Sequence, residues 1–244
     1  LAVGGSATVE GGIGAAHALG WRFLDAKGIE LAPVGANLER IARIVPPAPP
    51  AHPLPEILVL ADVDNPLCGE RGAARVFGPQ KGATPAMVER LDAGLRNLAL
   101  RLGEATGRQV LDLPGGGAAG GLAAGAVGFL GGRIVSGIET IMSVSGLAEE
   151  LQGADWVITG EGKFDDQSLH GKVVSGIAAL ARRHGVKVAV IAGSVQVPAP
   201  AWQAAGIACA LPTAPPDLPL DQALDQARAL LAQTARYFAL EHLR

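Results

Sequence analysis

The feature that most constrains the fold of this chain is the alternation of strand and helix patterns in its last third. Apolar runs at 156–159, 186–192 and 207–211 have the length and continuity of buried strands. The closing segment has apolar residues at helical spacing, at Leu220, Leu224, Ala227, Leu231, Thr234 and Phe238. This alternation predicts a parallel, Rossmann-like α/β sheet, whose ligands bind at the carboxyl ends of the strands.

The earlier part of the chain is less regular and predicts a second domain. A proline-rich connection at 46–55 precedes a strand pattern, and a helix face follows it, marked by Leu91, Leu95, Leu98 and Leu102. We therefore expect an inserted second α/β domain at 25–150. Residues 1–24 and 151–244 would together form the Rossmann-like domain.

Composition excludes several classes of protein. With 49% hydrophobic and 18% charged residues the chain is globular, and a net charge of −3 without a basic patch argues against a nucleic-acid partner. No signal peptide is visible, and the charge-free stretch 115–132 is too rich in glycine for a membrane span, which indicates no membrane partner. Cys68 and Cys209 lack a CxxC partner and suggest reduced thiols in a cytoplasmic protein.

Reactive side chains are concentrated in one stretch, ADWVITGEGKFDDQSLHGK, at residues 154–172. A short strand pattern leads into two glycines, and a helix pattern begins at the end of the stretch. Glycines and free helix amides suit an anionic, phosphorylated ligand, although the spacing is not that of a Walker A loop. The candidate groups are Glu161, Lys163, Asp165, Asp166, His170 and Lys172. The alternative is an ordinary strand-to-helix turn with solvated charges.

Two further motifs carry candidate ligands. The glycine turn GGSAT at residues 4–8 offers the hydroxyls of Ser6 and Thr8 to a carboxylate or phosphate, or simply caps a helix. Asp62 and Asp64 follow a strand pattern and suit Mg²⁺, which takes few protein ligands. Their alternative is a turn whose side chains cap its own backbone.

Two more segments have both a functional and a structural interpretation. Arg71 and Lys81, in residues 69–82, could neutralise phosphate oxygens or be surface charges of a helix. The glycine-rich segment 114–121 could line a nucleotide or allow close helix packing.

Together these stretches resemble the glycerate kinase family. The matching strings are GGSAT at Gly4, DVDNPLCGERGAARVFGPQKGAT at Asp62, PGGGAAGGL at Pro114 and the stretch that begins at Ala154. Their order and spacing match along nearly the whole chain. The resemblance implies two α/β domains and an ATP- and Mg²⁺-dependent kinase that phosphorylates D-glycerate, most often at the 2-hydroxyl to give 2-phosphoglycerate.

The resemblance to a kinase family suggests a role for each candidate residue. Catalysis of phosphoryl transfer depends mainly on positioning the reactants and on cations that stabilise negative charge. Asp62 and Asp64 would lie near Mg²⁺. Lys172 and Lys163 would stabilise the transferring group, and Asp165 or Glu161 would accept the hydroxyl proton. The remaining substrate- or phosphate-binding candidates are Ser6, Thr8, Arg71, Lys81 and His170.

Two departures from the family pattern leave an alternative open. Val9 and Glu10 stand where family members usually have Asn or Thr followed by Asp. The family's N-terminal third, with its APDSFKGS turn, has no counterpart, so we expect the sheet to lack its leading strand. The alternative is a truncated, non-catalytic module that binds a small organic acid. Redox chemistry with a dinucleotide is a weak third possibility, because the chain has no GxGxxG signature after a strand pattern. An exposed sheet edge could also pair with a second copy in a homo-oligomer.

Overall fold

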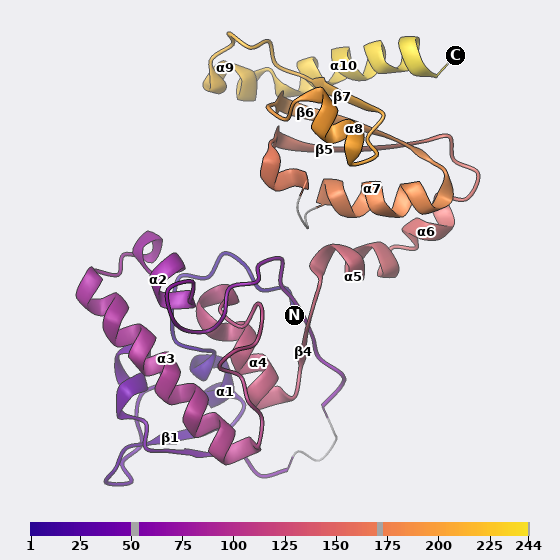
Figure 1. Cartoon of the computed structure of the whole chain (residues 1–244). Helices are drawn as coiled ribbons and strands as arrows, with labels where there is room; N and C mark the ends of the chain where they lie inside the picture. The colour runs from indigo at the N-terminus through magenta and orange to yellow at the C-terminus, as the bar shows by residue number, and fades with distance from the viewer. Residues whose placement is uncertain (50–53, 170–172, 244) are drawn as a thin grey trace. The chain divides into compact units, whose positions relative to one another are not determined.

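The computed structural model describes residues 1–49, 54–169 and 173–243. The chain divides into two compact units, Leu1–Gly137 and Ile138–Arg244 (Figure 1). The fold is mixed α/β with parallel strand pairs in both units, which confirms the predicted class. Each unit has a hydrophobic core of its own, as expected for separate domains.

The first unit contains two small two-stranded sheets. Strand β1 (Arg22–Leu24) pairs antiparallel with β2 (Arg43–Val45), and β3 (Leu58–Leu60) pairs parallel with β4 (Arg133–Val135). The helices that surround them are α1 (Ile13–Ala18), α2 (Ala73–Phe77), α3 (Pro85–Thr106) and α4 (Leu122–Leu130), with 3₁₀ turns η1 (Gly35–Arg40), η2 (Pro79–Lys81) and η3 (Ala118–Gly121).

Residues 1–24 contribute to the core of the first unit, and their predicted grouping with 151–244 in one domain stays a prediction. Ala2 forms a parallel bridge with Leu60, so the first residues extend the β3–β4 sheet. Phe23 is fully buried in the core of the same unit. These contacts depend on strand pairing and core packing, which the local sequence pattern does not show.

The longest helix, α3, follows directly from its sequence. The Thr84 side chain accepts a hydrogen bond from the Met87 N–H, Pro85 occupies the first turn, and Gly107 ends the helix with a left-handed backbone. The predicted apolar face is buried at Leu95, Leu98 and Leu102. Local signals and core packing therefore agree along this helix.

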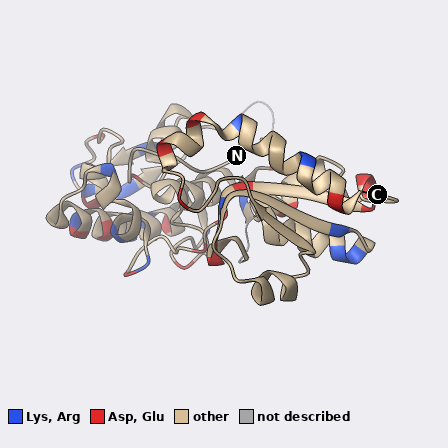
Figure 2. Ribbon diagram, turned by 90° about the horizontal axis from the view of Figure 1, so that it is seen from above, with Lys and Arg blue, Asp and Glu red and all other residues tan. Residues whose placement is uncertain are grey.

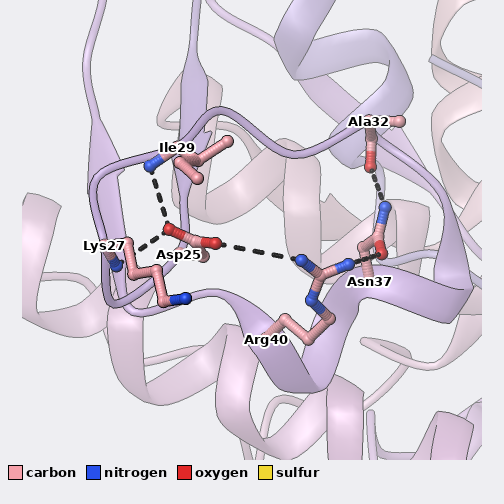
Figure 3. Close-up of polar contacts among 6 residues, drawn as sticks. All are labelled: Asp25, Lys27, Ile29, Ala32, Asn37 and Arg40. Carbon is pink, nitrogen blue, oxygen red and sulfur yellow. Dashed lines mark hydrogen bonds and ion pairs between the residues drawn. The ribbon is translucent and has the colours of Figure 1, made fainter.

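The turn after β1 is held by one carboxylate. Asp25 Oδ1 accepts hydrogen bonds from the Lys27 and Ile29 N–H groups, each at 2.9 Å, and Oδ2 lies 3.8 Å from the Arg40 guanidinium (Figure 3). Arg40 also donates to the Asn37 side chain in η1. These contacts, led by the Ile29 N–H, lower the pKa of Asp25 and fix the turn that leads toward η1.

The second unit is a three-stranded parallel sheet in the order β5–β6–β7. Its strands are Trp156–Phe164, Lys187–Val195 and Cys209–Pro212. Helix α7 (Val173–His184) covers one face of the sheet, and α10 (Ala227–His242) lies on the other (Figure 1). The remaining helical elements are α5 (Gly137–Val144), α6 (Leu147–Glu150), η4 (Asp166–Leu169), α8 (Ala199–Ala204) and α9 (Leu220–Asp225).

Strand β5 is longer than the pattern 156–159 predicts, because the two glycines expected in a turn are part of the strand. Gly160 pairs with Ile191, and a Cβ at Gly160 would lie 2.3 Å from the Ile191 carbonyl oxygen. Only a residue without a side chain permits this close approach. Glu161 and Lys163 are therefore strand residues.

Two helix predictions also need correction. The helix that the glycine turn at residues 4–8 could cap begins only at Ile13, because residues 6–12 form an irregular turn. The closing helix is divided at Gln226 into α9 and α10.

In the described part of the chain, no helix combines the length and hydropathy needed to cross a membrane. The glycine-rich segment 115–132 forms the short elements η3 and α4 and leads into β4. Along the described ribbon, Lys and Arg residues are interspersed with Asp and Glu (Figure 2).

Candidate functional site

The glycine-rich segment packs directly against the GGSAT turn in the first unit. Gly11 N–H donates to the Gly120 carbonyl at 3.0 Å. A Cβ at Gly120 would lie 2.1 Å from the Thr8 carbonyl oxygen, and one at Gly125 would lie 2.3 Å from that of Gly11. The structure thus supports the close-packing interpretation of the glycines, and this packing positions the residues from Ser6 to Glu10.

Lys81 lies 75 residues after Ser6 in the sequence but contacts the same turn. Its ammonium donates to Ser6 Oγ at 2.7 Å and to the Thr8 carbonyl at 2.8 Å. Burial lowers the pKa of Lys81, and the nearby Glu10 carboxylate acts in the opposite direction. Three residues that the sequence selected separately therefore form one cluster.

A cavity of about 290 Å³ opens beside this cluster. Thr8, Glu10 and Lys81 form its polar side, and apolar side chains such as Met87 and Leu91 form another part of its lining. The volume lies near the lower end of the roughly 300–1,000 Å³ typical of ligand sites. A partly desolvated cation at the edge of a small cavity is suited to a small anion.

Glu10 has a role that the sequence analysis did not identify. Its Oε1 accepts a hydrogen bond from the Gly12 N–H at 3.2 Å, and Oε2 accepts one from the Gly14 N–H at 2.8 Å. Glu10 therefore satisfies free amides at the start of α1 and holds the turn that contains Ser6 and Thr8. Its position shortly after the GGSAT turn and directly before Gly11 and Gly12 was the available signal.

The aspartates selected as metal ligands lie on the loop after β3. Asp62 Oδ1 accepts a hydrogen bond from the Gly137 N–H at 3.0 Å, and Asp64 is exposed, with Oδ2 3.9 Å from the Arg71 guanidinium. Arg71 is thus placed beside Asp64 and is not among the contacts of the Lys81 cluster. Asn65 ties the loop to the next turn, because its side-chain amide donates to the Arg71 carbonyl at 2.8 Å.

These two carboxylates fit a hard cation that keeps most of its waters. Asp62 has one oxygen oriented by a backbone amide, and Asp64 carries a second carboxylate two residues away, which is the donor type that Mg²⁺ prefers. No group of three or more His, Cys, Asp or Glu side chains suited to a metal occurs among the residues that the structure describes. Asp62 and Asp64 therefore remain a predicted partial ligand set.

Residues 161–172 of the second unit contain the candidate acids and lysines, and we call this segment the acid–lysine turn. An ion pair and a hydrogen bond between residues close in sequence hold its described part. Lys163 Nζ lies 3.2 Å from Asp165 Oδ2, and Asp165 Oδ1 accepts a hydrogen bond from the Gln167 N–H at 3.0 Å. Glu161 Oε1 is buried and has no hydrogen-bond partner within the described ranges. The other two candidates of this turn, His170 and Lys172, lie outside the described residues.

The carboxyl ends of the strands in the second unit border a much larger cavity, of about 1,310 Å³. Glu161 and Lys163 of β5, Ser194 of β6 and Thr213 after β7 are among its polar lining residues. This is the edge at which the parallel topology predicts ligands. The structure thus gathers Ser6, Thr8 and Lys81 in one unit and Glu161, Lys163 and Asp165 in the other.

Comparisons with known proteins identify the relatives of this chain. The model of the "Glycerate kinase family" matches residues 1–241. The chain is 42% identical over 241 residues to a glycerate kinase of Halalkalibacterium halodurans, and the match covers 98% of this chain and 63% of that protein. It is 43% identical over 196 residues to glycerate 2-kinase of Escherichia coli, covering 80% and 51% of the two proteins.

A solved structure gives the same relationship in three dimensions. The crystal structure of a glycerate kinase homologue from Salmonella typhimurium LT2 superposes with a TM-score of 0.79 at 40% identity, covering 98% of this chain and 62% of that one. The chain therefore spans between about half and two thirds of the length of these relatives.

Proposed function

Since this chain belongs to the glycerate kinase family, we propose that it carries binding and catalytic residues of an ATP- and Mg²⁺-dependent kinase. The proposed reaction, in the cytoplasm, converts D-glycerate to 2-phosphoglycerate. The observation that carries the proposal is the Lys81 ammonium, which Ser6 Oγ and the Thr8 carbonyl hold at the edge of a cavity of about 290 Å³. Glycerate is a small acid with one negative charge, which the Lys81 ammonium can attract.

The Lys81 cluster is the proposed site for the glycerate carboxylate. The ammonium is partly removed from water, so its attraction to a carboxylate is less screened than at an exposed lysine. Ser6 Oγ lies beside it and can donate its own proton to the ligand while accepting from Lys81. Glu10 keeps the turn in place through Gly12 and Gly14.

Asp62 and Asp64 are the proposed holders of Mg²⁺. When bound with ATP, the ion neutralises charge on the phosphate oxygens. Asp62 is oriented for this by the Gly137 N–H, while the exposed Asp64 can turn toward a ligand. Arg71, 3.9 Å from Asp64, would supply a further positive charge near the phosphates.

The second unit supplies the proposed proton acceptor and phosphate cations. Asp165 is fixed by the Gln167 N–H and lies 3.2 Å from Lys163. A positioned carboxylate can accept the hydroxyl proton of glycerate as the oxygen attacks phosphorus. Lys163, together with Lys172 and His170, would stabilise charge on the transferring group, and Glu161 is the second candidate base.

A coupled assay of ADP release tests the proposal, with D-glycerate, ATP and Mg²⁺ as substrates. It should be run on this chain and on a chimera that adds the part of the Halalkalibacterium halodurans kinase outside the matched region. We expect glycerate-dependent ADP release in at least one of them, with 2-phosphoglycerate as the product by NMR. Folded protein that is silent in both would exclude glycerate kinase activity.

Asp165→Asn and Asp155→Asn form a matched pair within that assay. A general base contributes roughly 10²–10⁴-fold to the rate, so Asp165→Asn should lower kcat by about that factor. Asp155→Asn makes the same chemical change at an exposed residue just before β5, at the opposite end of the strand, and should change kcat by less than about threefold. Equal rates for the two variants would remove Asp165 from the chemistry.

One observation favours a second candidate, a non-catalytic module that binds a small organic acid. The Lys81 cluster and its cavity are built entirely from residues of the first unit. Binding there would not require the acid–lysine turn. Calorimetry with D-glycerate separates the two: saturable binding without any ADP release in the chimera would support the module.

A further inference from the structure

The cavity beside Lys81 has one polar wall and one apolar wall. Among its described lining residues, only Thr8, Glu10 and Lys81 have polar side chains, and the others are apolar residues or glycines. Met87 and Leu91 lie one turn apart on α3 and therefore on the same face of the helix. A ligand that contacts both walls combines a charged end with an apolar end.

The charge that this cavity offers to a ligand is positive. Both oxygens of Glu10 already accept hydrogen bonds from backbone amides at the start of α1. The Lys81 ammonium has three N–H donors, and its described contacts with Ser6 Oγ and the Thr8 carbonyl use two of them. The third donor is left for a ligand oxygen, and a carboxylate is the acceptor that binds an ammonium most strongly. One cation with one such donor fits a ligand with a single carboxylate.

The apolar wall offers no side-chain donor or acceptor to the hydroxyls of glycerate. Val34 and Met87 are 48% and 49% exposed, so this wall carries apolar surface that water contacts. At Gly35 the wall is closely packed, because a Cβ there would lie 2.6 Å from the Val9 carbonyl oxygen and 2.8 Å from Leu91 Cδ2. A hydrocarbon tail that covers the wall would remove apolar surface from water, which is favourable. Glycerate has a hydroxyl on each carbon beyond its carboxylate and lacks such a tail.

We propose that this cavity binds short-chain monocarboxylic acids with an apolar tail, such as butyrate. The carboxylate accepts a hydrogen bond from Lys81, and the tail lies against Met87 and Leu91. Such an acid excludes D-glycerate from the same cavity and is therefore its competitor. The competition rests on the glycerate site proposed above, whereas binding of the acid itself does not depend on the kinase reaction.

Nuclear magnetic resonance tests the proposal on this chain, which contains two methionines, Met87 at the cavity and Met142 in the other unit. Carbon-13 labelling of their methyl groups gives one reporter and one internal control. Titration with acetate, propionate and butyrate should shift the Met87 signal saturably and leave the Met142 signal unmoved. Complete burial of one methylene corresponds to about a fourfold gain in affinity, so each step of the series should tighten binding by about twofold to fourfold.

Two further ligands test the carboxylate and the competition. 1-Butanol has an apolar tail without a charge and should give no saturable shift of the Met87 signal. D-Glycerate should raise the butyrate concentration needed for the half-maximal shift, because the two acids use the same ammonium.

Met87→Gln and Leu100→Gln are the matched variants. Both residues are exposed on α3, at 49% and 56%, but only Met87 lines the cavity. Glutamine is a good helix former, so both variants should fold as the parent chain does. With the backbone amides of residues 6–12 as reporters, Met87→Gln should reduce the gain in affinity from acetate to butyrate to less than about twofold, and Leu100→Gln should preserve it.

The inference is wrong if butyrate leaves the Met87 signal unmoved while D-glycerate shifts the amides of residues 6–12, and that result would leave the proposed glycerate site intact. It is also wrong if affinity does not rise along the acid series, or if Met87→Gln keeps the full gain. Saturable butyrate binding that D-glycerate does not weaken would support the inference and would remove this cavity from the proposed kinase site.

Discussion

Replacing Gly125 by alanine tests whether close glycine packing positions the Lys81 cluster. Gly125 is buried in α4, where its backbone is helical. Alanine is favoured over glycine by about 1 kcal/mol inside a helix, so propensity alone predicts stabilisation. In this structure, however, the new Cβ would lie 2.3 Å from the Gly11 carbonyl oxygen and 3.2 Å from Gly12 Cα.

The steric overlap determines the direction and the size of the change in the free energy of unfolding. A carbon and a carbonyl oxygen rest at about 3.3 Å or more, so α4 and the turn at Gly11 must separate by about 1 Å. Both contacts are backbone atoms, and no side-chain rotation relieves them. Overpacking of this kind costs about 1–3 kcal/mol. After the gain of about 1 kcal/mol from propensity, we expect a net destabilisation of up to about 2 kcal/mol.

Urea denaturation measures this change, and Gly103→Ala in α3 is the matched control. There the added Cβ would meet only the end of the flexible Gln109 side chain, at 3.2 Å. Gly103→Ala should therefore be neutral or stabilising by up to about 1 kcal/mol. Gly125→Ala should also weaken D-glycerate binding, because Gly11 belongs to the turn that carries Ser6 and Thr8.

The reasoning fails if the two variants change stability in the same direction. Equal or greater stability of Gly125→Ala would show that α4 and the glycine turn can separate without cost. A loss of stability with unchanged glycerate affinity would confirm the overlap but break the proposed link between the glycine packing and the Lys81 cluster.

Four other perturbations have outcomes that follow from the geometry. Lys81→Met should weaken D-glycerate binding about tenfold to a hundredfold, because it removes a charged hydrogen-bond donor. As burial lowers the pKa of Lys81, the ammonium of the unliganded protein loses its proton as pH rises through a value below that of ordinary lysines. Calorimetry should therefore show affinity falling over that alkaline range, and Lys81→Arg should remove the fall. Gly137→Ala places a Cβ 2.7 Å from Asp62 Oδ1, so the Mg²⁺ concentration needed for half-maximal activity should rise about tenfold or more; an unchanged requirement would separate Asp62 from the metal. Burial raises the pKa of Cys68 to about 12 and also raises that of Cys209, so a thiol reagent at pH 8 should label neither until urea unfolds the chain.

Local signals in the sequence were sufficient to predict an element when its start, its apolar face and its end are all specified within one segment. The cap at Thr84, the spacing of Leu95, Leu98 and Leu102 and the stop at Gly107 specify α3 without reference to the rest of the chain. The apolar runs of the last third likewise specified the parallel sheet, because continuous apolar strands separated by helices have few other solutions. The family resemblance rested on motifs of the same local kind, and the comparisons confirmed it.

Local signals were insufficient where contacts between segments distant in the sequence determine the structure. Gly160 looked like a turn residue, yet its register with Ile191 makes it part of β5. The bridge from Ala2 to Leu60 and the burial of Phe23 in the core of the first unit likewise join segments that are distant in the sequence.

For the candidate site, the sequence by itself determined the kinds of residue available, and the tertiary structure decided which of them meet. Ser6, Thr8, Lys81 and Arg71 were all selected as candidate ligands, because hydroxyls and cations suit an anion wherever they stand. Only the fold shows that Lys81 reaches Ser6 while Arg71 lies beside Asp64. The physical reason is that backbone contacts such as that between Gly125 and Gly11 set the distances between segments, and such contacts leave no periodic signal in the sequence.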